Sequence, residues 1–324
     1  MSAVSPDTLV PIGTYFDVYD CFRDENTNAL SITCYDKIKK CSEFYTRDLD
    51  IAECGSYREY VNKIVPFMGF AGVRYICDET DNLNIFDDGA NADLEGTETI
   101  RDLLDDIAEA TQTIYYLDVN NCLVFRRYSI NKAPDYTITK DMYTMLDSGE
   151  NRRLGTICHT SELGDSVYAS IEASGSTQFV RDNCFWVQRE DIRNIVESAI
   201  AVYGGLTINQ FTCSWRGDYR LEIGDKIGIE CKDGTVVYSY VLYDTIRYEG
   251  GLAFESEWNY KQSDSESASN PTSLGDMLKQ TYARVDKANK EIELVASRND
   301  ELAEEIAQIK IDTESINLSV SNTQ

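Results

Sequence analysis

The sequence has 324 residues, is 42% hydrophobic and carries a formal net charge of −26 at pH 7, from 30 basic and 56 acidic residues. A chain of this length can form two or three domains with hydrophobic cores, and its acidity argues against a nucleic-acid groove and against docking on an anionic membrane. The acidity predicts no stable nucleic-acid binding. No run of 18 apolar residues occurs, so we also predict no membrane insertion.

The cysteine and histidine content limits which metal sites and disulfides the sequence could form. None of the ten cysteines has the Cys-x-x-Cys spacing, and the sequence contains one histidine. A zinc site of ordinary spacing is therefore not expected. The cysteine count alone would allow disulfides, but nothing at the N-terminus resembles a signal peptide, so we expect reduced, mostly buried thiols in a protein made in the cytoplasm.

The first predicted element is a β-hairpin over residues 11–37. Apolar residues alternate with polar ones on both sides of a polar tip at residues 24–28, which is typical of two antiparallel strands. A hairpin alone is only marginally stable in water, so this one must pair with another part of the protein.

A helix followed by a second helix and a hairpin predicts a small α+β unit over residues 53–134. Ser56 and Glu59 have capping-box spacing at the start of the first helix, which Pro66 and Gly69 close. The second helix runs from about Thr99 with an apolar stripe on one face, and two strands follow it around residues 118–121. The stripe consists of Ile100, Leu103, Leu104, Ile107 and Ala108.

Residues 135–262 are predicted to be mostly β, with one helix from Glu190 to Tyr203 that ends at Gly204. Asp233-Gly234 is the strongest hairpin signal in the chain. Several short antiparallel strands packed with one helix favour a small closed or nearly closed β-barrel.

After a polar linker at 263–273, residues 274–324 show apolar residues every 3.5 positions. A single helix packed on the body would show a 3.6 period and a wider stripe, so the pattern favours a self-associating coiled coil. We predict that its contacts are made by Leu274, Leu278, Val285, Ala288, Ile292, Val295, Asn299, Leu302, Ile306 and Ile309, with Glu305 and Lys310 as an exposed pair between chains.

Asn299 is the polar residue of this predicted seam. It occupies an a position between Val295 and Leu302, where an amide lowers stability but specifies the register of the helices. The alternative is a random polar interruption of the pattern.

No constellation of residues predicts catalysis, a cofactor or a metal. His159 would have to serve any Ser-His-Asp or Cys-His site, and its neighbour Cys158 points to the opposite face if this segment is a strand. The acidic stretch 78–94 lacks the residue order of an EF-hand, and Asp87-Asp88-Gly89 is more typical of a turn. We find no Gly-rich phosphate loop, and carboxylate pairs are uninformative in so acidic a chain.

The order of these elements resembles the hub proteins of bacteriophage and prophage tails, the tail-associated or "prophage endopeptidase tail" family. TYFDVYDCFRDENTNALSITCYDKIKK (14–40) is similar to the end of the first hub barrel, and TIRDLLDDIAEATQTIYYLDVNNCLVFRRY (99–128) to the unit inserted between barrels. GDYRLEIGDKIGIECKDGTVVYSYVLYDTIRYEGGLAFESEW (217–258) resembles the final barrel strands, and VDKANKEIELVASRNDE (285–301) the helical stem.

The resemblance implies an α+β fold, mainly antiparallel β, of small β-barrel hub domains with an inserted α+β unit and a C-terminal trimeric coiled coil. Residues 1–52 would be the end of an incomplete first barrel, because the family normally has a longer N-terminal segment there, and 135–262 the second barrel. The family's peptidase activity, where present, resides in later domains, so no catalytic residue is carried over.

The function that this family implies is structural. A homotrimer would close the distal end of the tail tube, contact the distal tail protein, the tail tube and the tape measure protein, and carry a stem towards the host cell surface. The protein would be assembled in the bacterial cytoplasm and lie at the virion tail tip, where an acidic channel would repel DNA during ejection. The alternatives are a tail-tip cell-wall hydrolase or peptidase and a receptor-binding adhesin.

Overall fold

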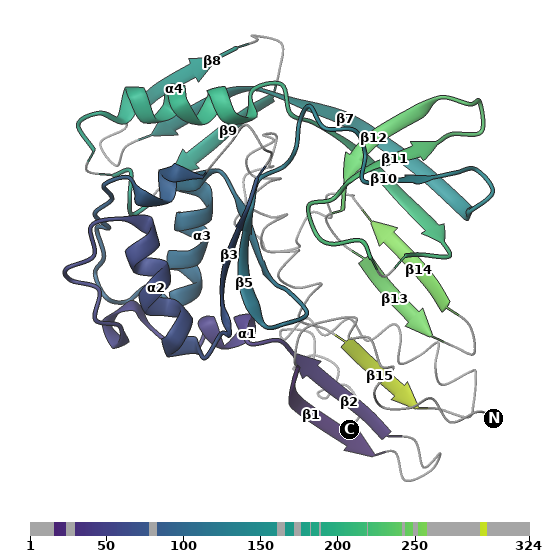
Figure 1. The fold of residues 1–324 in the computed structure, drawn as a ribbon, viewed down its shortest axis with the longest axis horizontal. Helices are drawn as coiled ribbons and strands as arrows, with labels where there is room; N and C mark the ends of the chain where they lie inside the picture. The colour runs from purple at the N-terminus through teal and green to yellow at the C-terminus, as the bar shows by residue number, and fades with distance from the viewer. Residues whose placement is uncertain are drawn as a thin grey trace, which may run out of the picture. The chain divides into compact units, whose positions relative to one another are not determined.

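The computed structural model describes residues 16–23, 30–77, 83–160, 166–171, 176–181, 183–187, 189–218, 220–241, 244–248, 252–257 and 292–296. These residues form two compact units (Figure 1). The smaller unit contains 16–35 and 292–296, and the larger contains the described residues from Asp36 to Glu257.

The smaller unit is a three-stranded antiparallel sheet. The strands β1 (Asp17–Arg23) and β2 (Leu30–Tyr35) form the hairpin that the alternating pattern predicts. The third strand, β15 (Ile292–Ala296), pairs with β2, so the order is β1-β2-β15. A hairpin needs such a partner for stability, and β15 provides it.

The strand β15 differs from the helix that the heptad pattern predicts at Ile292 and Val295. Ile292 lies opposite Cys34 and Val295 opposite Ser31. Both are β-branched residues, whose restricted side chains suit a pleated sheet better than a helix, and β2 offers an edge for pairing. The long-range pairing therefore replaces the local heptad preference over these five residues.

The larger unit begins with helices around a small sheet. In chain order these elements are α1 (Ile38–Cys41), η2 (Thr46–Asp48), α2 (Tyr57–Met68), β3 (Gly72–Ile76), η3 (Asn84–Asp87), α3 (Ile100–Thr111), β4 (Ile114–Leu117) and β5 (Cys122–Arg126). Both predicted helix starts are confirmed, because Ser56 accepts from the backbone N–H of Glu59 and Thr99 forms a capping box with Asp102. Gly69 ends α2 in the left-handed conformation.

The sheet of this α+β unit has the order β3-β5-β4. The antiparallel pair β4–β5 is the hairpin predicted around residues 118–121, with Asn121 at φ 61° in its turn. The strand β3 pairs parallel to β5, which the sequence did not predict. The apolar stripe of α3 is buried as predicted, at 0–1% exposure for all five residues.

The rest of the larger unit consists of β strands and one helix. In chain order these are β6 (Tyr136–Ile138), β7 (Tyr143–Thr160), β8 (Ser166–Ser170), β9 (Ser176–Arg181), α4 (Ile192–Tyr203), β10 (Thr207–Trp215), β11 (Lys226–Glu230), β12 (Val236–Tyr240), β13 (Asp244–Tyr248) and β14 (Leu252–Glu257). The prediction of one helix among β strands is confirmed, as is the hairpin at Asp233-Gly234, but β7 has 18 residues and is not one of the short strands expected. One hydrophobic core runs through the α+β unit and these strands.

The strands form two sheets that do not close into a barrel within the described ranges. One sheet has the order β13-β14-β10-β7-β8, with β9 also on β7, and the other has the order β12-β11-β6. The prediction of a closed barrel is therefore not confirmed. Pairing is mainly antiparallel, but β6–β11 and β7–β9 are parallel.

Side chains join the two sheets where the backbone ladder does not. The register of β10 against β7 shifts between Asn209 and Phe211, as at a β-bulge. Beside this shift the Ser239 hydroxyl donates to the Asn209 carbonyl at 2.9 Å, and the Asn209 amide donates to the Tyr238 carbonyl. A further bond joins β7 to β11, because the Tyr143 hydroxyl donates to the Glu230 carbonyl at 3.0 Å. These bonds satisfy strand groups that would otherwise need a closed ladder.

All ten cysteines are free thiols in the structure, and only four of them are buried, fewer than the majority that we expected. The buried ones are Cys41, Cys54, Cys184 and Cys213. In the part of the chain that the structure describes, no helix is both long and apolar enough to cross a membrane.

Candidate functional site: the junction between the α+β unit and the β sheets

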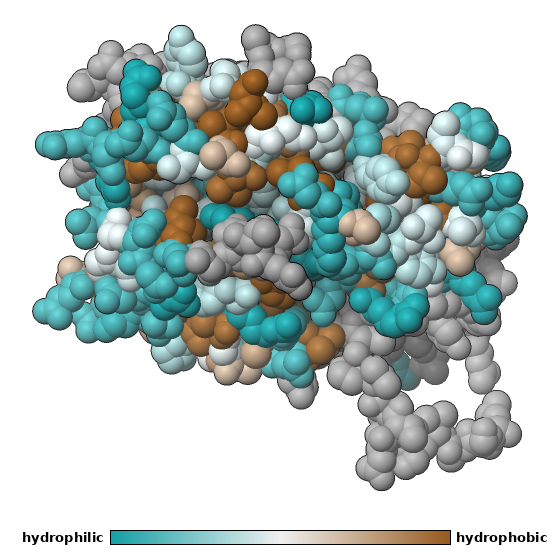
Figure 2. Space-filling view, turned by 45° about the horizontal axis from the view of Figure 1, so that its top comes forward, coloured by the Kyte–Doolittle hydropathy of each residue, from teal (hydrophilic) through white to brown (hydrophobic). Residues whose placement is uncertain are grey.

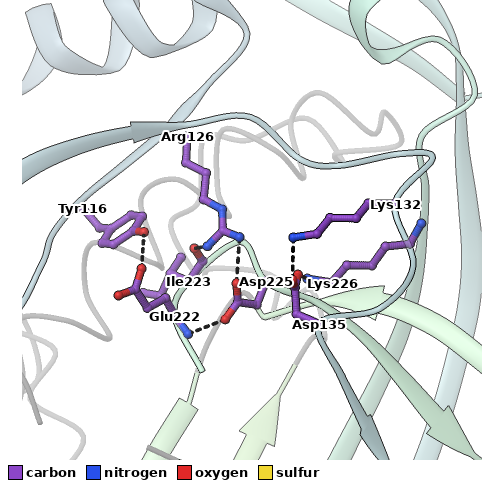
Figure 3. Close-up of polar contacts among 8 residues, drawn as sticks. All are labelled: Tyr116, Arg126, Lys132, Asp135, Glu222, Ile223, Asp225 and Lys226. Carbon is purple, nitrogen blue, oxygen red and sulfur yellow. Dashed lines mark hydrogen bonds and ion pairs between the residues drawn. The ribbon is translucent and has the colours of Figure 1, made fainter. Parts of the chain in front are cut away.

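A buried polar cluster in the larger unit centres on Arg126, the last residue of β5 (Figure 3). Its guanidinium donates from Nη2 to Asp225 Oδ1 at 2.7 Å and from Nη1 to the Ile223 carbonyl at 3.0 Å. The two charged side chains are only 9% and 15% exposed. The ion pair therefore ties the α+β unit to the loop that leads into β11.

The loop reaches Arg126 because Gly224 permits a tight turn. Gly224 has φ +85°, a left-handed conformation that favours glycine. A Cβ at this position would lie 2.9 Å from Ile114 Cδ1 and 3.0 Å from Arg126 Cδ. Asp225 closes the turn, since its Oδ2 accepts from the backbone N–H of Glu222 at 2.7 Å. The Gly-Asp pair thus brings backbone and carboxylate together against β5.

Tyr116 of β4 adds a second contact to the same loop. Its hydroxyl donates to Glu222 Oε2 at 3.2 Å (Figure 3). Burial and the Glu222 carboxylate raise the pKa of Tyr116 above its usual value, although Arg126 opposes them. Burial acts to lower the pKa of Arg126, but Tyr116 and Asp225 outweigh it, so the guanidinium stays charged. The cluster is a set of paired charges and not a proton-transfer site.

Asp135 forms a third connection, to the first residue of β11. Its Oδ2 accepts from the Lys226 backbone N–H at 3.0 Å and its Oδ1 from Lys132 Nζ at 2.6 Å. Burial acts to raise the pKa of Asp135, but the lysine ammonium and the backbone N–H lower it below its usual value. Lys226 Nζ in turn donates to the Ile130 carbonyl at 2.6 Å. The segment leaving the α+β unit is thereby fixed along β11.

Three buried tyrosines continue the junction towards α4. The Tyr128 backbone N–H donates to the Tyr203 hydroxyl at 3.0 Å, and the Tyr240 hydroxyl donates to the Ser129 carbonyl at 3.1 Å. The Tyr128 ring lies 6.0 Å from that of Tyr203 and 4.8 Å from that of Tyr240. These contacts fix the orientation of the segment after β5 relative to α4 and β12.

Residues that could have carried chemistry lie in structural positions. His159, the sole histidine of the chain, is 3% exposed in β7 and packs edge-to-face on Trp186, with ring centroids 5.8 Å apart. Asp87 of the acidic stretch is bonded through both carboxylate oxygens to Arg58. Within the described ranges no three His, Cys, Asp or Glu side chains come together as a metal site.

The structure reaches only two of the predicted oligomerisation residues, Ile292 and Val295, both in β15. The other ten lie outside the described residues, so the coiled coil there stays a prediction; they are Leu274, Leu278, Val285, Ala288, Asn299, Leu302, Glu305, Ile306, Ile309 and Lys310. The Arg126 junction was missed by the sequence reasoning. Its local signals were Arg126-Arg127 at the end of an apolar strand and the turn at Gly224-Asp225.

Structure comparison finds similar solved proteins, whereas sequence comparison gives no match: no protein-family model and no curated protein matches the chain. The chain is similar to the tail protein from Neisseria meningitidis MC58, with a TM-score of 0.54 and 10% identity over 82% of each chain. The 43 kDa tail protein of prophage MuSo2 from Shewanella oneidensis gives a TM-score of 0.48 at 12% identity, covering 75% of this chain and 77% of that one. A chain of the phage P2 baseplate gives 0.30 at 12% identity, covering 76% and 75%. The similarity to the Neisseria tail protein shows that the two chains share a mixed α+β fold.

Proposed function

We propose that the protein is a structural component of a bacteriophage or phage-like tail, a hub that closes the distal tail tube at the tail tip. The observation that carries the proposal is the fold shared with the Neisseria tail protein over 82% of both chains. The order of hairpin, α+β unit and β sheets, which resembles tail hub proteins, supports it from the sequence. Its partners would be the distal tail protein, the tail tube and the tape measure protein.

A trimeric state belongs to the same proposal. The heptad pattern after residue 274 supports self-association, and the Arg126 junction would hold the two parts of each protomer rigidly enough to build a ring. A net charge of −26 suits a protein that surrounds passing DNA without binding it. The acidic surface would then repel the DNA phosphates.

Light scattering and negative-stain electron microscopy on the full chain test this proposal. We expect a particle of about three times the 36.7 kDa chain mass with threefold symmetry and a central opening. A stable monomer at micromolar concentration, in the presence and absence of the neighbouring tail proteins, would refute the hub.

The proposal includes that the protein is not an enzyme. The single histidine of the chain is buried against Trp186, where solvent barely reaches it. We expect no clearing in a peptidoglycan zymogram, and the same blank result for His159→Ala. Lysis by the wild type that His159→Ala abolishes would instead favour a cell-wall hydrolase.

A further inference from the structure

The outward face of α2 carries an open pocket that the proposed hub role does not use. The pocket has a volume of about 280 Å³ and is lined by Asp50, Glu53, Cys54, Glu59, Asn62 and Lys63. Glu59, Asn62 and Lys63 are exposed on the helix, and the loop at residues 50–54 forms the opposite wall. Described residues leave this face of α2 uncovered.

The charges of the pocket are unequal. Its three carboxylates, Asp50, Glu53 and Glu59, face one ammonium group, Lys63, whose Nζ lies 3.5 Å from Asp50 Oδ2. Glu59 uses one oxygen to accept from the Gly55 N–H at 2.6 Å. Glu53 has no hydrogen-bond or ion-pair partner among the described residues. The pocket therefore has carboxylate oxygens available, and its three carboxylates outnumber its one ammonium group.

An exposed aromatic pair borders the pocket. Phe67 and Phe44 are 42% and 40% exposed and pack edge-to-face with ring centroids 5.5 Å apart. Phe67 follows Lys63 by four residues on α2, so the two side chains are neighbours on the same helix face. On the face of the molecule drawn in Figure 2, exposed hydrophobic residues form only small separate groups among hydrophilic ones, so a small apolar group of two rings is of the usual size for this surface. An exposed aromatic pair next to an excess of carboxylates offers a partner both apolar contact and negative charge.

We propose that this face of α2, from Glu53 to the Phe44–Phe67 pair, docks an arginine-containing basic segment of a partner protein. The guanidinium would lie between the carboxylates, and the methylene stem would cover the rings, with which the cation also interacts favourably. The net charge of −26 steers basic partners towards the surface, and the excess of carboxylates at this face opposes the docking of another acidic surface here. A neutral glycan would leave Glu53 without a counter-charge. The proposal does not depend on the hub role.

Fluorescence anisotropy with the full chain tests the docking. The probe is a fluorescein-labelled peptide, Gly-Ser-Leu-Arg-Leu-Arg-Ser-Gly, compared with the same peptide carrying glutamate for arginine. We expect the arginine peptide alone to bind, and more weakly at 200 mM than at 50 mM NaCl. Glu53→Gln should weaken binding by roughly two- to fivefold, the range of one exposed ion pair, and Phe67→Ala should weaken it to a similar degree.

Matched controls separate the site from the general acidity of the chain. Glu197→Gln removes a carboxylate from the exposed face of α4, and Tyr168→Ala removes a ring that is 67% exposed on β8. Both should leave the affinity unchanged. Phe67 is exposed, so Phe67→Ala should preserve the fold, and an unchanged melting temperature of the variant checks this. Glu53→Gln tests the docking face independently of Phe67.

Three results would overturn the proposal. The first is equal loss of affinity in Glu53→Gln and Glu197→Gln, which would mean nonspecific attraction. The second is absence of arginine-peptide binding at millimolar protein. The third is binding of an N-acetylglucosamine hexamer that Phe67→Ala abolishes while the arginine peptide is unaffected, which would assign the face to glycans.

Discussion

Arg126 and Asp225 are 99 positions apart in the sequence, and their side chains form a 2.7 Å ion pair that is largely removed from water. Arg126 ends a strand of the α+β unit, and Asp225 precedes the first residue of β11. The pair therefore connects two parts of the chain that local sequence patterns treat separately.

Removing one member of this pair should destabilise the protein strongly. Asp225→Ala leaves a buried guanidinium without its counter-ion, and Arg126→Met leaves the carboxylate, so each should cost about 3–5 kcal/mol of unfolding free energy. The double variant Arg126→Met/Asp225→Ala should cost less than the sum of the single changes. Urea denaturation followed by circular dichroism measures all three. Asp50→Ala is the control, because the Asp50–Lys63 pair is exposed and should contribute at most about 1 kcal/mol. Strict additivity would show that the pair is not coupled.

The turn at Gly224 should be more sensitive to substitution than a similar turn elsewhere. Gly224 and Gly234 have φ +85° and +84°, so alanine at either costs about 1–2 kcal/mol from the left-handed backbone. At Gly224 the new Cβ would also meet Ile114 and Arg126, whereas at Gly234 nothing lies within 4 Å. Gly224→Ala should therefore lower the melting temperature more than Gly234→Ala. Equal effects would mean that the loop moves away from β5 without cost.

Asp36 predicts a pH dependence of stability. The carboxyl is 1% exposed, its Oδ2 has no hydrogen-bond partner among the described residues, and burial raises its pKa from 3.8 to about 8. A folded-state pKa above the unfolded value favours folding at low pH, and this stabilisation is lost between pH 4 and 8, by up to about 1.4 kcal/mol per pH unit. Asp36→Asn keeps the shape and removes the charge. The variant should therefore gain stability relative to the wild type as the pH rises to 8.

Asp135→Asn is the matched control, because its stability relative to the wild type should change with pH in the direction opposite to that of Asp36→Asn. The pKa of Asp135 is lowered in the folded state, so its stabilisation is present above the unfolded pKa and is lost as the pH falls through the folded value. Asp135→Asn should be less stable than the wild type at pH 7 and similar to it near pH 3. Melting temperatures across pH 3–9 measure both variants. A constant difference between Asp36→Asn and the wild type would show that Asp36 is ionised throughout.

The heptad prediction can be tested on a peptide spanning residues 272–324. We expect a concentration-dependent helical circular dichroism spectrum, and Asn299→Ile should raise the melting temperature, because each buried isoleucine adds roughly 1.5–3 kcal/mol. The same change should broaden the distribution of assembly masses, since the polar layer that penalises shifted registers is lost. A lower melting temperature would place Asn299 outside the core. A β spectrum would show that the strand preference of residues 292–296 dominates even in isolation.

The sequence by itself determined the helices and several of the hairpins in the larger unit, although it did not predict the strand β3. The apolar period of α3 and α4, the caps Ser56 and Thr99, and the turn at Gly234 are local properties that depend on residues within a few positions of one another. The same locality allowed the hairpins β1–β2 and β4–β5 to be predicted.

The tertiary structure alone decided which elements become neighbours. The parallel pairings β3–β5, β6–β11 and β7–β9 join strands that no turn connects, and the sheets meet through Asn209 and Ser239 instead of closing a ladder. The strand at residues 292–296 replaces a heptad because β2 offers it backbone partners. Arg126 finds Asp225 in the same way. Periodicity reports which face of an element is apolar, but the group that covers this face is fixed only when distant segments compete for the same core.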